Sequence, residues 1–347
     1  MIDALILTAV TACAMTWLML RVAGRWLIHD APVDRSSHDR PTPTLGGLGI
    51  IAGTWAGYCS WLLHAEISLI SHPWLMFANL ILLLFVIDDV RRPLSVREKL
   101  GLQLAAALAV CASGILVSEI ELPRLVHHVL AGPWCWLATV FWLVALMNVV
   151  NFMDGIDGIG AVQTLTAGAW FAVCLWASGS PLWTGVLIVV VATAAFLPFN
   201  FPPARIFMGD VGAMFLGLQF GVFSVLGAAA GLPLWVFAGV FGYYLFDVSY
   251  TLVRRALRRE NLLVAHRLHI YQRLGGECGW SQRQVDAAVA VLNLILGAGV
   301  FLLSGLGDVV ITQAFPTQAT GSILVAIGAV ALIAASVVVE SGDRRAA

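Results

Sequence analysis

Charged residues are scarce in this sequence. Asp, Glu, Lys and Arg make up 11% of its 347 residues, whereas a soluble domain carries about 25%. Hydrophobic residues make up 60%, and the mean hydropathy is +0.90. The shortage of charge therefore excludes a single soluble core and indicates a membrane protein with several spans. The net charge of −1 gives no electrostatic reason to expect nucleic-acid binding.

Paired cysteines are also lacking. The six cysteines are scattered, and no two stand at a CxxC spacing. No cysteine or third histidine stands at ligand spacing from His266 and His269, which disfavours a zinc site. Most of the cysteines lie in apolar segments, where a small buried thiol is the simplest interpretation: Cys13, Cys59, Cys111, Cys135 and Cys174.

Long apolar runs fill most of the chain. A spanning helix needs about 20 mostly apolar residues. No Lys or Arg precedes the first run and no small-residue cleavage site follows it, so we expect a retained helix rather than a signal peptide. We predict an all-α, polytopic integral membrane protein, one domain over residues 1–347, with about eleven transmembrane helices, or ten because 73–88 and 181–198 are short. The expected spans are roughly 2–20, 45–63, 73–88, 100–118, 133–151, 160–178, 181–198, 211–229, 232–253, 285–305 and 320–339.

Lys and Arg separate the loops into two groups. All but one of the 19 basic residues fall in one set of alternate loops or in the C-terminal tail, and the opposite set holds only Arg124. By the positive-inside rule, the basic set is cytoplasmic. The N-terminus is then outside and the C-terminus cytoplasmic, which agrees with an odd number of spans. The predicted cytoplasmic loops are about 21–44, 89–99, 152–159, 199–210 and 254–284.

Carboxylates gather at the same predicted face. The motifs "DD", "DGIDG" and "GD" all open onto it at similar depth, and Asp247 lies near the cytoplasmic end of the ninth span. Five converging acidic groups repel one another unless a cation lies among them. Mg²⁺ prefers oxygen ligands, commonly one or two carboxylates with substrate phosphates. The pattern therefore predicts a metal–phosphate site at Asp88, Asp89, Asp154, Asp157 and Asp210.

Polar residues accompany these carboxylates. In "NVVNFMDGIDG", helical spacing aligns Asn148 with Asn151, and with Asp154 if the helix extends that far, and the glycines permit a tight turn. An Asx-rich turn between two helices is the alternative. Lys99 meets either a phosphate or the lipid headgroups, and Asn200 and Asp210 bracket a proline-bearing loop. We expect His266 and His269, three residues apart, to share a helical face and to contact a phosphate or nucleotide.

These residues, in this order, resemble the polyprenyl-phosphate N-acetylhexosamine-1-phosphate transferases. The resemblance covers about Arg35 to Gln272. It rests on "RSSHDRPTPTLGG", "DD" with Lys99 and Gln103 beyond it, "NVVNFMDGIDG", "FMGDVG" and the histidine loop. The histidine element "HRLHIYQ" differs from the consecutive histidines of the peptidoglycan enzyme. It resembles the branch that initiates O-antigen or other surface polysaccharides.

The resemblance implies a Mg²⁺-dependent enzyme, with Mn²⁺ as an alternative ion, in the bacterial cytoplasmic (inner) membrane, with its active site on the cytoplasmic face. It would transfer N-acetylhexosamine-1-phosphate from a UDP-N-acetylhexosamine to undecaprenyl phosphate and release UMP. A homodimer is left open. By resemblance, Asp210 is the first metal ligand, with Asp89 and Asp154 beside it, and Asp88 deprotonates or orients the lipid phosphate. Asp89 is also a candidate base, and the expected substrate contacts are Lys99, Asn148, Asn151, Asp154, Asp157, Asn200, His266 and His269.

Two other functions compete with this prediction. An ion-coupled transporter also carries intramembrane carboxylates, but it predicts charges near the midplane and internal repeats. Here the carboxylates lie at one face, and the sequence has no evident repeat. A non-catalytic scaffold for glycan assembly would not need the aspartates. The choice between direct attack by the lipid phosphate and a covalent aspartyl intermediate is left open.

Overall fold

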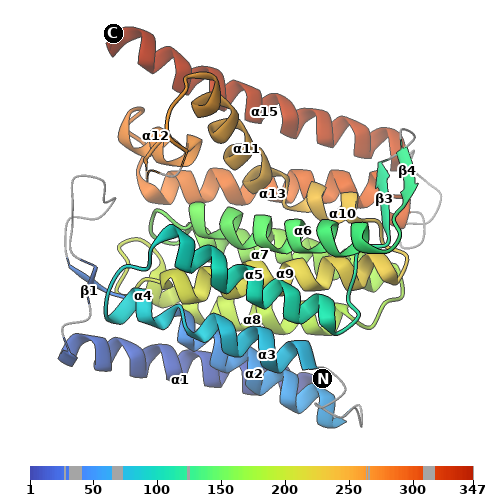
Figure 1. The fold of residues 1–347 in the computed structure, drawn as a ribbon. Coiled ribbons are helices and arrows are strands. Elements are labelled where there is room, and N and C mark those ends of the chain that lie inside the picture. The colour runs from blue at the N-terminus through green and yellow to red at the C-terminus, as the bar shows by residue number, and fades with distance from the viewer. Residues whose placement is uncertain are drawn as a thin grey trace.

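The chain folds into a bundle of roughly aligned helices (Figure 1). The computed structural model describes residues 1–26, 29–30, 41–64, 73–122, 126–262, 264, 266–307 and 317–346. The helices run from α1 to α15 as follows: α1 (Ile2–Trp26), α2 (Gly47–His64), α3 (Pro73–Leu83), α4 (Val86–Val90), α5 (Val96–Ala112), α6 (Pro133–Phe152), α7 (Ile159–Ala177), α8 (Trp183–Asn200), α9 (Gly209–Ala229), α10 (Leu234–Val240), α11 (Gly242–Leu257), α12 (Ile270–Gly276), α13 (Gln282–Leu303) and α15 (Thr317–Ala346).

Strands in the described residues form only two antiparallel pairs. β1 (His29–Asp30) pairs with β2 (Thr42–Pro43), and β3 (Glu119–Leu122) pairs with β4 (Val126–Val129). In Figure 1, β1 lies at the end of the bundle where α4 and α12 are found, and the β3–β4 hairpin lies at the other end. The two chain termini also lie toward opposite ends of the bundle (Figure 1).

The structure confirms the predicted fold class, an all-α protein with several helices able to span a membrane. Seven of the described helices are long and apolar enough to cross a membrane: α1, α6, α7, α8, α9, α13 and α15. The pair α10 and α11, bent by 81° at a break, would be an eighth. Each of the eleven predicted segments coincides with a helix or with this pair, although α2, α3 and α5 are shorter or less apolar. The exact span count, the orientation and the single-domain assignment stay predictions.

Helix α9 forms the centre of the bundle. Every residue from Val211 to Val225 is buried, and α9 packs against α6, α2, α7 and α8. Its sequence is apolar all round, as expected for a helix enclosed by others. The first polar residue of α9, Asp210, is therefore held at a fixed position at the end of the central helix.

Small residues bring α1 and α2 close together. Gly49, Gly53 and Gly57 stand four apart on one face of α2. A Cβ added at any of them would lie 2.0–2.5 Å from an atom of α1, at Thr16, Ala12 and Thr8 respectively. Such stripes let helix backbones approach closely in membranes, where apolar burial alone does not hold helices together.

Candidate active site

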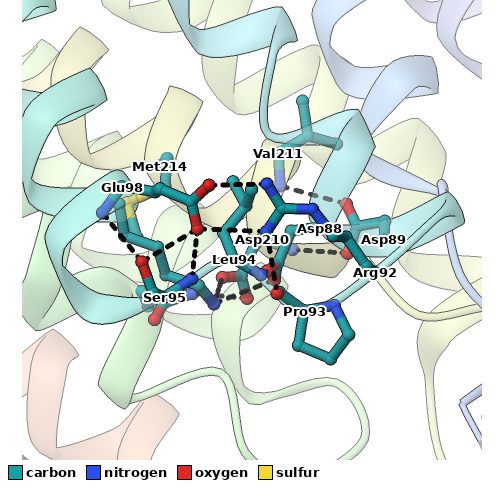
Figure 2. Close-up of polar contacts among 12 residues, drawn as sticks. Asp88, Asp89, Arg92, Pro93, Leu94, Ser95, Glu98, Asp210, Val211 and Met214 are labelled. Atoms are coloured by element: carbon teal, nitrogen blue, oxygen red, sulfur yellow. Dashed lines mark hydrogen bonds and ion pairs between the residues drawn. The ribbon is translucent and has the colours of Figure 1, made fainter.

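Lys99 joins two carboxylates from distant parts of the chain. Its Nζ donates to Asp88 Oδ2 over 2.8 Å and to Asp210 Oδ2 over 2.5 Å. Figure 2 shows these two aspartates side by side, one from α4 and one from α9. Burial lowers the pKa of Lys99, but the two carboxylates raise it by more, so the net pKa lies above its usual value. Lys99 is therefore a charged ammonium between two acidic groups.

The loop between α4 and α5 holds Asp88 and Lys99 in place. Ser95 begins α5 with a capping box, in which its hydroxyl and the Glu98 carboxylate each accept from the other residue's backbone N–H. Arg92 binds the same Glu98 carboxylate through two nitrogens, at 3.1 and 2.5 Å (Figure 2). Arg92, and then Ser95, lower the pKa of Glu98 to about 2. The backbone N–H of Leu94 donates to Asp88, so the loop fixes the orientation of the Asp88 carboxylate.

Asp89 faces a different partner from its neighbour. Its two oxygens accept from the backbone N–H groups of Asp210 (3.1 Å) and Val211 (3.3 Å), so it caps the N-terminus of α9 (Figure 2). Burial, and then the charge of Asp210, raises the pKa of Asp89 to about 7. Gly209 has φ +72° and leaves no room for a side chain, because a Cβ there would lie 2.7 Å from the Asp89 carboxylate.

The two asparagines of α6 have separate roles. Asn151 donates from Nδ2 to Asp210 Oδ1 over 3.0 Å, which places it in the same cluster as Lys99. Asn148 instead exchanges two hydrogen bonds with Gln103 of α5, at 2.9 and 3.2 Å. The predicted alignment of Asn148 and Asn151 is confirmed because both belong to α6, but Asn148 makes the contact between α5 and α6. Asp154 lies beyond the end of α6 and does not extend this face.

The glycine-rich turn after α6 carries Asp154 and Asp157. Asp154 accepts from the backbone N–H of Gly160 at the start of α7, and burial followed by the charge of Asp210 raises its pKa to about 7. Asp157 accepts from the backbone N–H of Ala204 over 2.8 Å. Asn200 accepts from Gly158 N–H and donates to the Ile206 carbonyl, both at 3.1 Å. These bonds join the turn to the loop between α8 and α9.

The prediction that His266 and His269 share a helical face is wrong. Both precede the first residue of α12, and His269 is its N-cap, because Asp247 accepts from the backbone N–H groups that begin the helix at Ile270. The two rings nevertheless lie together, with centroids 5.0 Å apart. Burial, then the charges of His269 and Arg255, lowers the pKa of His266 to about 4. His266 is consequently neutral at pH 7.

Three further residues shape this region and were not expected as site residues. Asp247 is fully buried and accepts from His269 Nδ1 and from the N–H groups of Ile270 and Tyr271, at 3.0–3.2 Å. Tyr271 donates from its hydroxyl to the Phe152 carbonyl over 3.0 Å. A carboxylate inside an apolar segment is the sequence signal that marks Asp247, whereas the role of Tyr271 depends on packing that the sequence does not reveal.

Asp286 is the third of these residues. It belongs to α13 and is 2% exposed, and no protein donor in the described residues hydrogen-bonds to either of its carboxylate oxygens. A Cβ on Gly158 would lie 2.7 Å from its Oδ2, so Asp286 packs directly against the turn that carries Asp157. A buried acidic group without a partner is costly to the fold.

The carboxylates at this site fit a magnesium ion only if phosphate oxygens of the substrate complete its ligands. In the part of the chain that the structure describes, no three His, Cys, Asp or Glu side chains are arranged to surround a metal ion. Asp88 and Asp210, however, bind the same cationic group, the Lys99 ammonium. Two carboxylates completed by phosphate oxygens are a usual magnesium environment. Arg35, His38 and Arg40, in the first predicted cytoplasmic loop, lie outside the described residues.

Fold and site together define an α-helical membrane protein with an acidic, lysine-bridged site where several helices end. Comparison with known proteins agrees with this class. The model of glycosyl transferase family 4 matches residues 72–228. The chain is 29% identical, over 86% of its length and 84% of the relative, to the probable undecaprenyl-phosphate N-acetylglucosaminyl 1-phosphate transferase of Bacillus subtilis.

A second relative extends the match. The phospho-N-acetylmuramoyl-pentapeptide-transferase of Moorella thermoacetica is 31% identical over 76% of this chain and 85% of the relative. The chain therefore belongs to the polyprenyl-phosphate hexosamine-1-phosphate transferase superfamily. This membership makes the protein a membrane-bound phosphosugar transferase and favours an enzyme over a transporter or a scaffold.

Proposed function

We propose that the protein transfers N-acetylhexosamine-1-phosphate from a UDP-sugar to undecaprenyl phosphate, releasing UMP. The product is the lipid-linked first sugar of a surface polysaccharide such as O-antigen. The proposal places the enzyme in the bacterial inner membrane with the site at the cytoplasmic face. The name of the Bacillus subtilis relative gives undecaprenyl phosphate and N-acetylglucosaminyl 1-phosphate, and the name of the Moorella thermoacetica relative gives phospho-N-acetylmuramoyl-pentapeptide as the transferred group.

The observation that carries this proposal is that Lys99 donates hydrogen bonds to both Asp88 and Asp210. The bridge brings α4, α5 and α9 together at one point, and Asn151 adds the end of α6. A site of this kind can take a diphosphate, because phosphate oxygens can accept from the Lys99 ammonium and the two carboxylates would hold a divalent cation that supplies further positive charge.

In the proposed reaction, one phosphoanhydride is exchanged for another. An oxygen of the lipid phosphate attacks the sugar-bound phosphorus, the bond from that phosphorus to the bridging oxygen breaks, and UMP leaves with the electron pair. The main barrier is bringing one phosphate anion up to a diphosphate, so positioning and charge stabilisation are the work of the site. Lys99 would donate to the phosphates, and Asp88 would orient the attacking lipid phosphate or take its proton.

Asp210, with Asp88, would hold Mg²⁺. When bound, the ion supplies positive charge that neutralises the repelling phosphates and stabilises the leaving group. Asp89 fixes the start of α9 and so the position of Asp210. Asp154, Asp157 and Asn200 would form the part of the site that receives the nucleotide, since they join the two loops beside the bridge.

The direct test is incubation of membranes containing the protein with polyprenyl phosphate, Mg²⁺ and a panel of UDP-N-acetylhexosamines, followed by measurement of UMP release. UMP should form with one or more of these sugars and only when the lipid acceptor is present. Asp210→Asn should lose at least about a hundredfold in rate while still inserting and folding. Glu119→Gln, on the exposed β3–β4 hairpin at the other end of the bundle, is the matched control. Near-normal turnover of the Asp210 variant would refute the proposed role of the bridge.

A further inference from the structure

The histidine pair, His266 and His269, lies beside the candidate site. Its two rings are tilted by 33°, with centroids 5.0 Å apart. The His269 ring also lies beside the ring of Phe152, the last residue of α6, with 6.3 Å between the centroids. The preceding residue, Asn151, donates to Asp210 in the bridge. The pair therefore stands where α6 ends and the glycine-rich turn begins, next to the part of the site proposed to receive the nucleotide.

Asp247 fixes the proton of one ring. Nδ1 of His269 lies 3.0 Å from Oδ1 of Asp247, which is fully buried. Each oxygen of this carboxylate also accepts from a backbone N–H, Oδ1 from Ile270 and Oδ2 from Tyr271. Because an ionised carboxylate offers only acceptors, the nitrogen of His269 that faces it carries the proton. In the neutral ring, Nε2 then holds the lone pair, and no residue in the described part of the chain hydrogen-bonds to it.

The other ring is held in the opposite tautomer. Nδ1 of His266 accepts from the backbone N–H of Leu268 over 3.2 Å. A nitrogen that accepts carries no proton, so the neutral ring has its proton on Nε2. Burial lowers the pKa of His266 to about 4, which keeps this ring neutral at pH 7. Nε2 of His266 is consequently a donor, whereas Nε2 of His269 is an acceptor.

One donor beside one acceptor indicates a class of ligand. The ionised oxygens of a diphosphate only accept, so they would need a donor from both rings. A hydroxyl group donates and accepts at a single oxygen. We propose that the histidine pair binds one hydroxyl group of the sugar nucleotide, with His266 Nε2 donating to the hydroxyl oxygen and the hydroxyl donating to His269 Nε2. This inference rests on the proposed function, and the hydroxyl belongs to either the ribose or the hexosamine.

The tautomers can be measured without any substrate. Nitrogen NMR of the full-length protein in detergent at pH 7.5, labelled with ¹⁵N-histidine, separates protonated from unprotonated ring nitrogens. His266→Asn and His269→Asn assign the signals of the pair among the 8 histidines of the chain. The unprotonated nitrogen should be Nδ1 in His266 and Nε2 in His269. The same tautomer in both rings, or a doubly protonated His269, would overturn the proposal.

The ligand test compares the dissociation constant of a UDP-N-acetylhexosamine with those of analogues that each lack one hydroxyl of the ribose or of the hexosamine. Calorimetric titration without acceptor lipid measures these constants, so the result does not depend on turnover. One analogue should bind the wild-type protein about tenfold more weakly, as expected when one hydrogen bond is lost and its partners are left unpaired. The identity of that analogue assigns the hydroxyl to the ribose or to the hexosamine.

Two variants connect this loss to the histidine pair. His266→Asn and His269→Asn keep a polar group at the position of Nδ1, and so the bonds to Leu268 and Asp247, but have nothing at the position of Nε2. Each should bind the parent sugar nucleotide about tenfold more weakly, show no further loss with the critical analogue, and keep the unfolding midpoint of the wild-type protein. His128→Asn, on the exposed β3–β4 hairpin at the other end of the bundle (Figure 1), is the matched control and should bind like the wild type.

Several outcomes would overturn the inference. They are equal affinities for the parent and every analogue, additive losses when a variant meets the critical analogue, and no binding of any UDP-N-acetylhexosamine. Weaker binding of polyprenyl phosphate in both variants, with unchanged binding of the sugar nucleotide, would assign the pair to a phosphate instead. Recognition of the hydroxyl without release of UMP would leave this inference standing and refute the proposed transfer.

Discussion

The ammonium group of Lys99 lies 2.5 Å from the carboxylate of Asp210, although 111 residues separate them in the chain. Lys99→Met should therefore lower the rate of UMP release by at least about a hundredfold, because the variant leaves Asp88 and Asp210 facing each other without a fixed cation. Arg97→Met, at an exposed position two residues earlier, removes the same charge outside the bridge and should leave the rate within about twofold. Similar losses in both variants would point to a general charge effect.

Removing the divalent ion should stop transfer. In the presence of excess EDTA, UMP release should fall to background, and added Mg²⁺ should restore it, with Mn²⁺ also active, because two carboxylates and a diphosphate otherwise repel one another. Ca²⁺ at the same concentration tests whether the smaller, octahedral ion is needed. Full activity in EDTA would show that Lys99 alone supplies the positive charge.

Two substitutions of Asp89 should lower the stability of the fold by different amounts. Asp89→Ala removes both acceptors of the α9 cap and should destabilise the folded protein by about 1 kcal/mol, whereas Asp89→Asn keeps one acceptor and should cost less. Thermal unfolding in detergent measures the difference. Both variants should lose activity, because the start of α9 also carries Asp210. Equal unfolding midpoints for the two variants would argue against a capping role.

Gly155 and Tyr271 should be coupled. A Cβ on Gly155 would lie 2.2 Å from the Tyr271 hydroxyl oxygen, so Gly155→Ala must displace either the turn or the ring, and we expect at least about a tenfold loss of activity. Tyr271→Phe alone loses the hydroxyl's hydrogen bonds to the Phe152 carbonyl and from the backbone N–H of Gly155, each worth about 1 kcal/mol. In the double variant, the ring no longer carries the clashing oxygen, so part of the activity should return. Strictly additive losses in this double-mutant cycle would exclude the contact.

Asp286→Leu should stabilise the protein. The variant replaces a buried carboxyl group, whose oxygens have no hydrogen-bond donor in the described residues, with an apolar side chain of similar branching, so the free energy of unfolding should rise by about 1–3 kcal/mol. The unfolding midpoint in detergent at pH 7.5 reports this gain. Asp3→Leu, at an exposed position near the N-terminus, is the matched control. A lower midpoint in the Asp286 variant would mean that the carboxylate has a stabilising partner.

Much of the arrangement follows from the sequence. Apolar length locates the helices, since each predicted segment coincides with helical residues, and the distribution of basic residues predicts which helix ends share a face. Asp88, Asp210 and Asn151 are accordingly brought together as expected. Such convergence is predictable because each helix that spans a membrane must end near one of its two surfaces.

Other features depend on contacts between distant segments. The cap that Asp89 gives to α9 joins positions more than a hundred residues apart, and Asp247 decides where α12 begins by accepting from Ile270 and Tyr271. The three-residue spacing of His266 and His269 favours a helix, but the contacts of Asp247 begin the helix only after His269. Asp286 has no motif around it, and only packing against Gly158 reveals it.

The adjacency of Asp88 and Asp89 has a geometric consequence. Successive residues on a helix project about 100° apart around its axis, and α4 is only five residues long. Because Asp89 accepts hydrogen bonds from the amides of α9, the rotation of this short helix about its own axis is fixed. The direction in which Asp88 points is fixed with it. A change at Asp89 would thus misalign its neighbour by rotation alone, without altering a single atom of the neighbour itself.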